Sequence, residues 1–260
     1  MRRQPVEDGM FDKQRASFLI PGILILLSLP LRGQQTFVPR YDIYGGYGFL
    51  NSPAVSLFEH GFATQFGFRP KTWMSLGVDY TFATGDLKIR TDQLLPELQS
   101  KLQAGIAGGI KAGVLPANYP YGTMQVSAHS KTHTIAVGPQ LAYRRFSKAT
   151  LFFRPVYAGI MHESATPQPQ DAVIKAIVSS LITEPTKKDN VLFVGFGGGF
   201  DILVGKHFAW RTQSDLVYDH LFTDLMKDGR LTVRFSCGPA YNFGPNIVKQ
   251  RKAELKPPKN

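Results

Sequence analysis

RLTVRFSCGPAYNF, from Arg230 to Phe243, alternates bulky apolar residues with polar or small ones. Successive side chains of a β-strand point to opposite faces. A strand over this segment therefore has one apolar face and one polar or small face. The apolar face consists of Leu231, Val233, Phe235, Cys237, Pro239, Tyr241 and Phe243. Because the other face carries Arg230 and Arg234, the two sides of the strand must lie in different environments.

Other segments repeat this alternation with the same chemistry. In Thr134–Arg144 the apolar face opposes Gln140 and Arg144, and in Asn190–Val204 it opposes three glycines and Asp201. A soluble barrel that holds a ligand would line its cavity with the large apolar residues. Small and charged residues suit a narrow interior in which opposite charges pair. We therefore predict that the apolar face points outward, toward lipid.

Eight segments follow the alternation and are expected to be strands. They are Tyr41–Leu50, Phe62–Phe68, Trp73–Ala83, Thr132–Arg145, Thr150–Glu163, Asn190–Val204, Phe208–Leu221 and Arg230–Phe243. A tilted strand needs about 9 to 11 residues to cross a membrane. Most of the segments meet this length, and Phe62–Phe68 is the weakest.

The gaps between the segments alternate in length. Arg69–Thr72, Phe146–Ala149 and Gly205–His207 are tight turns, whereas Asn51–Gly61, Thr84–Lys131, Ser164–Asp189 and Phe222–Gly229 are longer. Outer-membrane barrels have short periplasmic turns and longer extracellular loops. We therefore predict an all-β fold, an eight-stranded antiparallel transmembrane β-barrel over residues 40–244. Its location would be the outer membrane of a Gram-negative-type bacterium.

The first 33 residues have the composition of a secretory leader. Arg2, Arg3, Lys13 and Arg15 precede the uncharged run Phe18–Leu31. A basic start followed by an apolar core of about 7 to 15 residues directs export. This run is shorter than the roughly 20 residues that a membrane-spanning helix needs. We predict a signal peptide over residues 1–33, with a permanent helical anchor as the alternative.

The net charge of +11 does not indicate nucleic-acid binding. Residues 1–33 hold five basic and three acidic residues, and residues 245–260 hold five and one, so the two ends supply six of the eleven net charges. The sequence contains no basic helix or stacking platform of the nucleic-acid-binding kinds. We predict that residues 245–260 form a basic, flexible tail.

Two of the longer gaps contain apolar residues at helical spacing. They are Leu94, Leu95, Leu98, Leu102 and Ile106 in the second gap, and Val173, Ile174, Ile177, Val178 and Leu181 in the third. We predict two amphipathic helices that pack on each other and on the barrel rim, with lipid or a partner as the alternative. Gly105, Gly108, Gly109 and Gly113 predict that the first helix breaks and is mobile.

Charged residues on the inward faces predict what fills the barrel. An eight-stranded barrel encloses room for side chains and little else. We expect an interior charge network of Asp79, Arg144, Arg154, Asp201, Arg211, Asp215 and Arg234. Aromatic residues near the outward strand ends are expected to form the interfacial girdles of a membrane barrel.

Five short motifs resemble the OmpA-like, porin-family outer-membrane β-barrel domain, in the style of acidobacterial members. They are GGYGF at Gly45–Phe49, GPQLAYR at Gly138–Arg144, GGGFD at Gly197–Asp201, RTQSD at Arg211–Asp215 and AYNF at Ala240–Phe243. The resemblance covers about residues 40–244 and speaks for the fold rather than for an activity. It implies a monomer whose partners are outer-membrane lipid and the barrel assembly machinery.

The end of the last expected strand carries a possible assembly signal. Tyr241-Asn242-Phe243 is similar to the aromatic-x-Phe signal by which the assembly machinery recognises a final strand. Tyr241 and Phe243 are therefore the expected assembly residues. The chain departs from the family pattern because residues 245–260 follow this signal.

The sequence favours a structural or surface-interaction role without catalysis. A small porin-like channel is the first alternative. A lipid A-modifying enzyme is the second, because His162-Glu163-Ser164-Ala165 has the His-x-Ser spacing that resembles lipid A deacylases. Against it, His162 is expected to share the inward face of Arg154, away from acyl chains, and the Asn-Ala continuation expected after the serine is missing.

No cofactor, metal or catalytic residue is expected. The remaining histidines, His60, His129, His133, His207 and His220, lack the spacing of metal ligands. The glycines of Gly195–Gly199 lie within an expected strand, which a phosphate-binding loop would not. Cys237 is the only cysteine, so an intramolecular disulfide is excluded.

Overall fold

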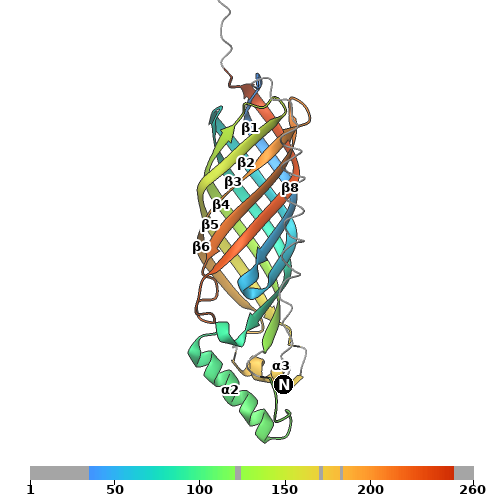
Figure 1. Ribbon diagram of the computed structural model, residues 1–260, viewed down its shortest axis with the longest axis vertical. Helices are drawn as coiled ribbons and strands as arrows, with labels where there is room; N and C mark the ends of the chain where they lie inside the picture. Colours follow the sequence, from blue (N-terminus) through green and yellow to red (C-terminus); the bar gives the residue numbers. More distant parts are fainter. Residues whose placement is uncertain (1–34, 121–123, 170–171, 182–183, 249–260) are drawn as a thin grey trace, which may run out of the picture.

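The computed structural model describes residues 35–120, 124–169, 172–181 and 184–248. The predicted signal peptide and residues 249–260 of the predicted tail lie outside this part of the chain. Eight antiparallel strands, β1 to β8, form a closed barrel in which each strand pairs with its sequence neighbours and β8 pairs with β1 (Figure 1). The predicted eight-stranded antiparallel barrel is confirmed.

All eight strands fall on the segments that alternate. They are β1 Pro39–Ser52, β2 Leu57–Lys71, β3 Met74–Arg90, β4 Gln125–Tyr143, β5 Ala149–Pro167, β6 Lys187–Leu203, β7 Phe208–Asp219 and β8 Arg230–Asn246. Most are longer than expected, because main-chain pairing continues beyond the apolar stretch. The pairing of β3 with β4, for example, runs from Met74 opposite Leu141 to Arg90 opposite Gln125.

The connections differ in length at the two ends of the barrel. We call the end with the β2–β3, β4–β5 and β6–β7 connections the turn end, and the opposite end the loop end. One predicted loop is wrong. In place of a long loop over Asn51–Gly61, β1 and β2 stay paired to Ser52 opposite Leu57, and only a 3-10 turn, η2 Pro53–Val55, joins them.

Two helices lie beyond the loop end, α2 Pro96–Lys111 and α3 Ala172–Leu181, as predicted (Figure 1). They pack together through a buried cluster that includes Leu102, Ile106 and Ile174. Within the part of the chain that is described, no helix is long and apolar enough to cross a membrane.

The predicted break in the first helix is wrong. α2 continues through Gly105, Gly108 and Gly109, and the chain turns away only at Gly113, which has a φ of +72°. Gly105 permits a close approach between the helices, because a Cβ there would lie 2.9 Å from Cγ2 of Ile177 in α3. The burial of the apolar face of α2 therefore outweighs the low helix propensity of its glycines.

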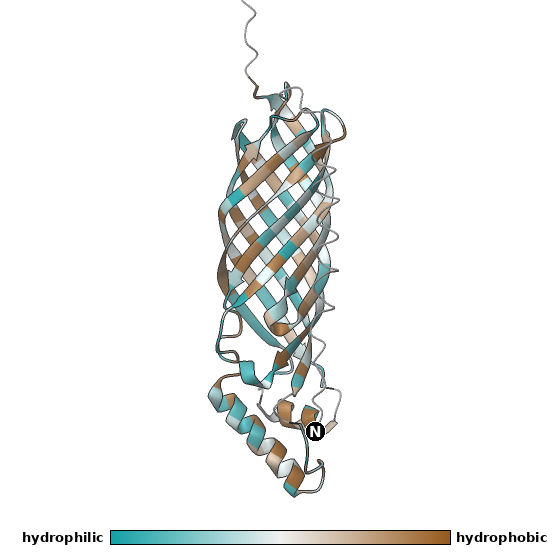
Figure 2. Ribbon diagram, viewed as in Figure 1, coloured by the Kyte–Doolittle hydropathy of each residue, from teal (hydrophilic) through white to brown (hydrophobic). Residues whose placement is uncertain are grey.

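The wall of the barrel is apolar outside and polar inside. Apolar and polar residues alternate along every strand in Figure 2, and the exposed side chains are the apolar ones. Ile135 is 59% exposed and Leu192 is 78% exposed, whereas the inward Arg154 and Arg211 are 0% and 1% exposed. This distribution is the reverse of a soluble domain and is that of a barrel whose wall faces lipid.

Aromatic rings gather in two bands on the outer wall. Near the turn end, the ring of Tyr41 lies 5.7 Å from that of Phe68 and 5.6 Å from that of Phe243. Nearer the loop end, Phe82 lies 5.9 Å from Phe62 and 4.8 Å from His133. Two such bands are typical of barrel girdles at the two membrane interfaces.

A β-bulge in β5 reverses one sequence-based assignment. Arg154 pairs with Gly197 and Tyr157 pairs with Gly195, so β5 uses one more residue than β6 between these points. The extra residue lies at Pro155 and Val156, which are both exposed. Proline suits a bulge because it cannot donate to the ladder. Before the bulge the even-numbered residues of β5 point inward, and beyond it the odd-numbered residues do.

The prediction that His162 points inward with Arg154 is consequently wrong. Met161 and Glu163 are buried in the interior, and His162 lies on the outer wall. Its Nδ1 forms a 2.8 Å hydrogen bond with Oδ1 of Asn190, and its ring lies 6.2 Å from that of His133.

Cysteine labelling can test this exchange. In a Cys237→Ala background, His162→Cys should react readily with a water-soluble maleimide in detergent, because its position is on the outer wall. Met161→Cys, one residue earlier and 0% exposed, should react at least about tenfold more slowly. Faster labelling at position 161 than at 162 would contradict the bulge.

Candidate functional site

The interior of the barrel is the candidate site. Its charged side chains form three groups, and Arg211 on β7 is the centre of the group nearest the turn end. Its Nε donates to Oδ1 of Asp201 at 2.8 Å and its Nη2 to Oδ2 of Asp42 at 2.7 Å. Its Nη1 donates to Oε1 of Gln65 at 2.6 Å. One guanidinium thereby joins side chains from β7, β6, β1 and β2 across the lumen.

Arg69 on β2 extends this group toward the turn end. Its Nη2 lies 3.2 Å from Oδ2 of Asp42 and donates to Oδ1 of Asn242 at 2.9 Å. Its Nη1 donates to the carbonyl oxygen of Pro39 at 3.0 Å. Asp42 therefore forms ion pairs with two arginines, Arg69 and Arg211.

A second group crosses the middle of the lumen. Arg154 on β5 pairs with Asp79 on β3 and, at 3.1 Å, with Oδ2 of Asp215 on β7. The guanidinium also lies over the ring of Tyr157, 4.2 Å from its centroid. Nearby, Nη2 of Arg234 donates to Oγ1 of Thr81 at 2.7 Å.

A third group lies toward the loop end. Arg230 pairs with Glu163 on β5 and, at 2.8 Å, with Oδ1 of Asp219 on β7. Thr232 donates from Oγ1 to the other oxygen of Asp219 at 3.1 Å. All four side chains are buried.

Two interior glycines leave room for these charges. A Cβ at Gly197 would collide with the carboxylate of Asp215, and one at Gly67 would collide with that of Asp42. The absence of a side chain at these inward positions is thus what lets a carboxylate lie flat against the neighbouring strand.

The seven residues predicted for the network fall into three kinds of position. Ion pairs join Asp79, Arg154 and Asp215, and separately Arg211 and Asp201. Arg234 is buried opposite Asp215 on β7, but its hydrogen-bond partners are neutral, since its Nη1 donates to the hydroxyl of Tyr157 at 3.4 Å. Arg144 lies at the turn end, where its hydrogen-bond partners are also neutral.

Sequence reasoning did not include several interior charges in the network. They are Asp42, Glu59, Arg69, Glu163, Asp219 and Arg230. Asp42 and Arg230 occupy polar-face positions of alternating segments, so the same signal could have found them. Glu163 could not be found in this way, because the bulge in β5 moves it from the outward to the inward parity.

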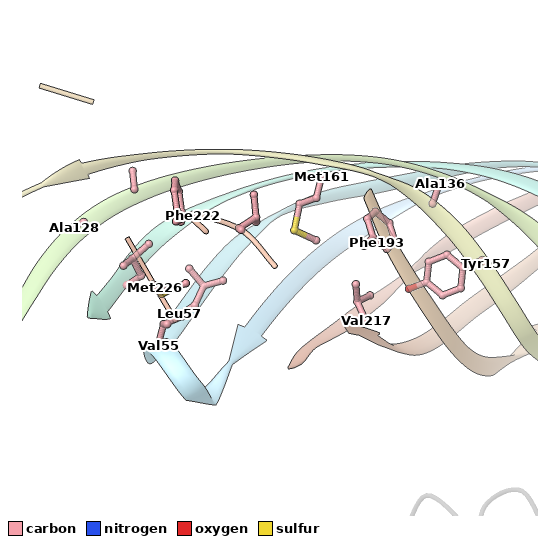
Figure 3. Packing of buried hydrophobic residues seen from close by; sticks show 13 residues of the cluster. Val55, Leu57, Ala128, Ala136, Tyr157, Met161, Phe193, Val217, Phe222 and Met226 are labelled. Atoms are coloured by element: carbon pink, nitrogen blue, oxygen red, sulfur yellow. The ribbon is translucent and has the colours of Figure 1, made fainter. Parts of the chain in front are cut away.

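Apolar side chains fill the interior at the loop end (Figure 3). Met161, Phe193 and Val217 point inward from β5, β6 and β7, and Phe222 and Met226 fold in from the β7–β8 loop. Below them, a cavity of about 10 Å³ beside Arg234 has space for about one water molecule. The lumen is thus occupied by side chains at several successive levels.

The expected assembly residues lie at the turn end of β8. Tyr241 is 41% exposed on the outer wall, and its ring lies 5.0 Å from that of Phe208 and 6.0 Å from that of Phe243.

Within the described residues, no group of three or more histidine, cysteine or acidic side chains is placed to hold a metal ion.

No family model and no curated protein matches the sequence. Similar solved structures include the neisserial surface protein A and the outer membrane protein OprG of Pseudomonas aeruginosa, each 10% identical with a TM-score of 0.47. Each comparison covers 82% of this chain and 100% of the other. The Yersinia pestis attachment invasion locus protein Ail, in complex with a heparin analogue, is 11% identical over 78% of this chain and 96% of its own, with a TM-score of 0.41. Likeness at this level assigns no function.

Removal of one interior charge should destabilise the barrel. Arg211→Gln leaves Asp201 and Asp42 buried with one cation fewer, which typically costs about 3–5 kcal/mol. Urea titration in detergent should therefore show a lower free energy of unfolding. Arg145→Gln, an exposed arginine of the β4–β5 turn, is the control and should unfold like the parent protein. Equal unfolding of the two variants would refute the structural role of Arg211.

Proposed function

We propose that the protein is an integral outer-membrane β-barrel of the OmpA-like kind, with a structural or surface-interaction role and a lumen filled by side chains. The observation that carries this proposal is the reversed distribution of polarity. Charged residues such as Arg154, Arg211 and Arg230 are at most 2% exposed, while the outer wall exposes rings and aliphatic chains.

The energetics of the wall support a lipid environment. Contact with water costs roughly 25 cal/mol per Å² of apolar surface, and soluble monomers rarely expose large contiguous apolar patches. Residues such as Val78, Ile135, Val194 and Phe208 are each more than half exposed and come from four different strands. Lipid chains remove this cost, because they are as apolar as the side chains that they contact.

The proposed orientation places the turn end in the periplasm and the loop end outside the cell, as in other outer-membrane barrels. Residues 1–33 would direct export. The predicted barrel, residues 40–244, extends to Pro39 and Asn246 because these residues pair, so the predicted tail over residues 245–260 would begin after Asn246, in the periplasm. Tyr241 and Phe243 would serve as the signal for the assembly machinery. The helical pair α2 and α3 would then be the surface offered to an extracellular partner.

Three levels of ion pairs and the apolar cluster at the loop end favour a closed lumen over the porin-like alternative. Arg211 alone links side chains of four strands. We propose no cofactor and no catalytic group. The barrel would act as a monomer, as the family resemblance implies.

Fractionation and electrophoresis test the main proposal. The full-length protein should sediment with outer membranes, and its unboiled form should migrate differently from the boiled form on a denaturing gel. Purified protein in planar bilayers should give no steady current. Recovery as a soluble periplasmic protein would overturn the location, and a steady current would overturn the closed lumen.

A lipid A deacylase is a second candidate, favoured by the outward position of His162. With Nδ1 of His162 bonded to Asn190 at 2.8 Å, its Nε2 could accept the proton of a serine hydroxyl. Ser164 shares the outer face, and Lys131 and Lys188 are its cross-strand neighbours. Against catalysis, the Ser164 hydroxyl donates to the carbonyl oxygen of Lys131 at 3.5 Å.

Deacylation by the purified protein discriminates this candidate. The main proposal predicts no fatty acid release from lipid A, and no difference between the parent protein and Ser164→Ala. Release that is lost in Ser164→Ala but retained in Ser147→Ala, a serine at the opposite end of the barrel, would establish the enzyme instead.

A further inference from the structure

The turn end of the barrel contains a cavity of about 350 Å³. Arg69, Arg144, Lys148 and Lys206 contribute to its lining, and Asp201 is the one carboxylate that the described residues place there. This cavity is open to solvent on one side and is separated from the rest of the lumen by the ion pairs of Arg211. It does not belong to the filled interior described above.

The chain segment just before β1 forms one wall of the cavity. Gln35 is 7% exposed, and its Nε2 donates to the carbonyl oxygen of Ala149 at 3.0 Å and to Oγ1 of Thr150 at 2.9 Å. The backbone N–H of Val38 donates to Oδ1 of Asn246 at 2.9 Å. These contacts hold the segment across the mouth of the barrel and give the cavity a fixed boundary.

Arg144 is the cation of this cavity that lacks a counter-ion. Its Nε donates to the carbonyl oxygen of Thr72 at 2.9 Å, and its Nη1 donates to Thr150 at 2.9 Å and to Gln35 at 3.3 Å. All three acceptors are neutral, and no carboxylate of the described residues lies within 4 Å of it. Enclosure by the protein, and then the charge of Arg69, lower the pKa of Arg144 to about 10.

Asp201, the carboxylate at the cavity, is already paired with Arg211. Both oxygens of Asp201 accept hydrogen bonds from Arg211, at 2.8 and 3.0 Å. Arg69 is likewise paired with Asp42. The charge of Arg144 therefore remains to be balanced, and the exposed Lys148 and Lys206 add positive charge to the lining. Enclosing a cation without an anion is unfavourable, so an anion in the cavity would remove that cost.

We propose that this cavity binds a phosphate group. A guanidinium N–H donates a strong, charge-assisted hydrogen bond to a phosphate oxygen, and lysines add charge without a directional requirement. The Nη2 of Arg144 is the donor for which no partner is recorded among the described residues, and it would supply the directional contact. Two sources carry this group: free phosphate in solution and the headgroup of a lipid at the membrane surface.

Calorimetric titration with inorganic phosphate tests the site. The full-length protein in a maltoside detergent should bind phosphate saturably at constant ionic strength, and chloride should not compete. Arg144→Gln should weaken binding at least tenfold, whereas Arg145→Gln, the adjacent arginine that lies over the ring of Tyr143, should bind like the parent. Absence of saturable binding, or equal binding by Arg144→Gln and the parent, would overturn the proposal.

Two further measurements complete the experiment. If Arg144→Gln fails to fold, judged by heat-dependent gel migration, Lys206→Gln on the exposed β6–β7 turn replaces it and should weaken binding about threefold; unchanged binding would count against the site. Titration of the protein in phospholipid nanodiscs separates the sources. Binding in both media identifies free phosphate as the ligand, and binding in detergent alone identifies a lipid phosphate that already occupies the cavity.

Discussion

Pairing between arginines and carboxylates across the lumen is the interaction on which the rest of the structure depends. A wall that is apolar outside must turn its other residues inward, and an unpaired charge there would be costly. Arg211, Arg154 and Arg230 each reach two carboxylates from different strands. These contacts brace the strands from within, while Gly67 and Gly197 keep the inner wall clear for them.

The barrel is closed differently at its two ends. At the loop end an apolar cluster closes it, because Phe222 and Met226 from the β7–β8 loop pack against Met161. At the turn end the closure is polar, through the segment Gln35–Val38 and the arginines beside it. The interior is therefore closed by apolar packing at one end and by polar and cationic groups at the other.

The sequence predicts the barrel well because alternation is a local property of each strand. It could not predict features that depend on pairing. The bulge beside Pro155 is visible only in the register of β5 against β6, so the predicted inward face of His162 is wrong. Pairing also extended β1 and β2 through a predicted loop to η2. At the site, the alternation of the sequence predicts that Arg211 and Asp201 point inward. The neutral hydrogen-bond partners of Arg144 come from other segments of the chain and are visible only in the structure.

The ring is closed by the first and last strands, with Tyr41 opposite Phe243 and Phe49 opposite Phe235. Every other pair joins strands that are adjacent in the sequence, so only this contact bridges nearly the whole chain. Long-range contacts form slowly because a large loop must close first. Until β8 pairs with β1, the sheet therefore has two unpaired edges. Truncation of β8 would therefore leave an open sheet whose edges can pair with other chains, and not a smaller closed barrel.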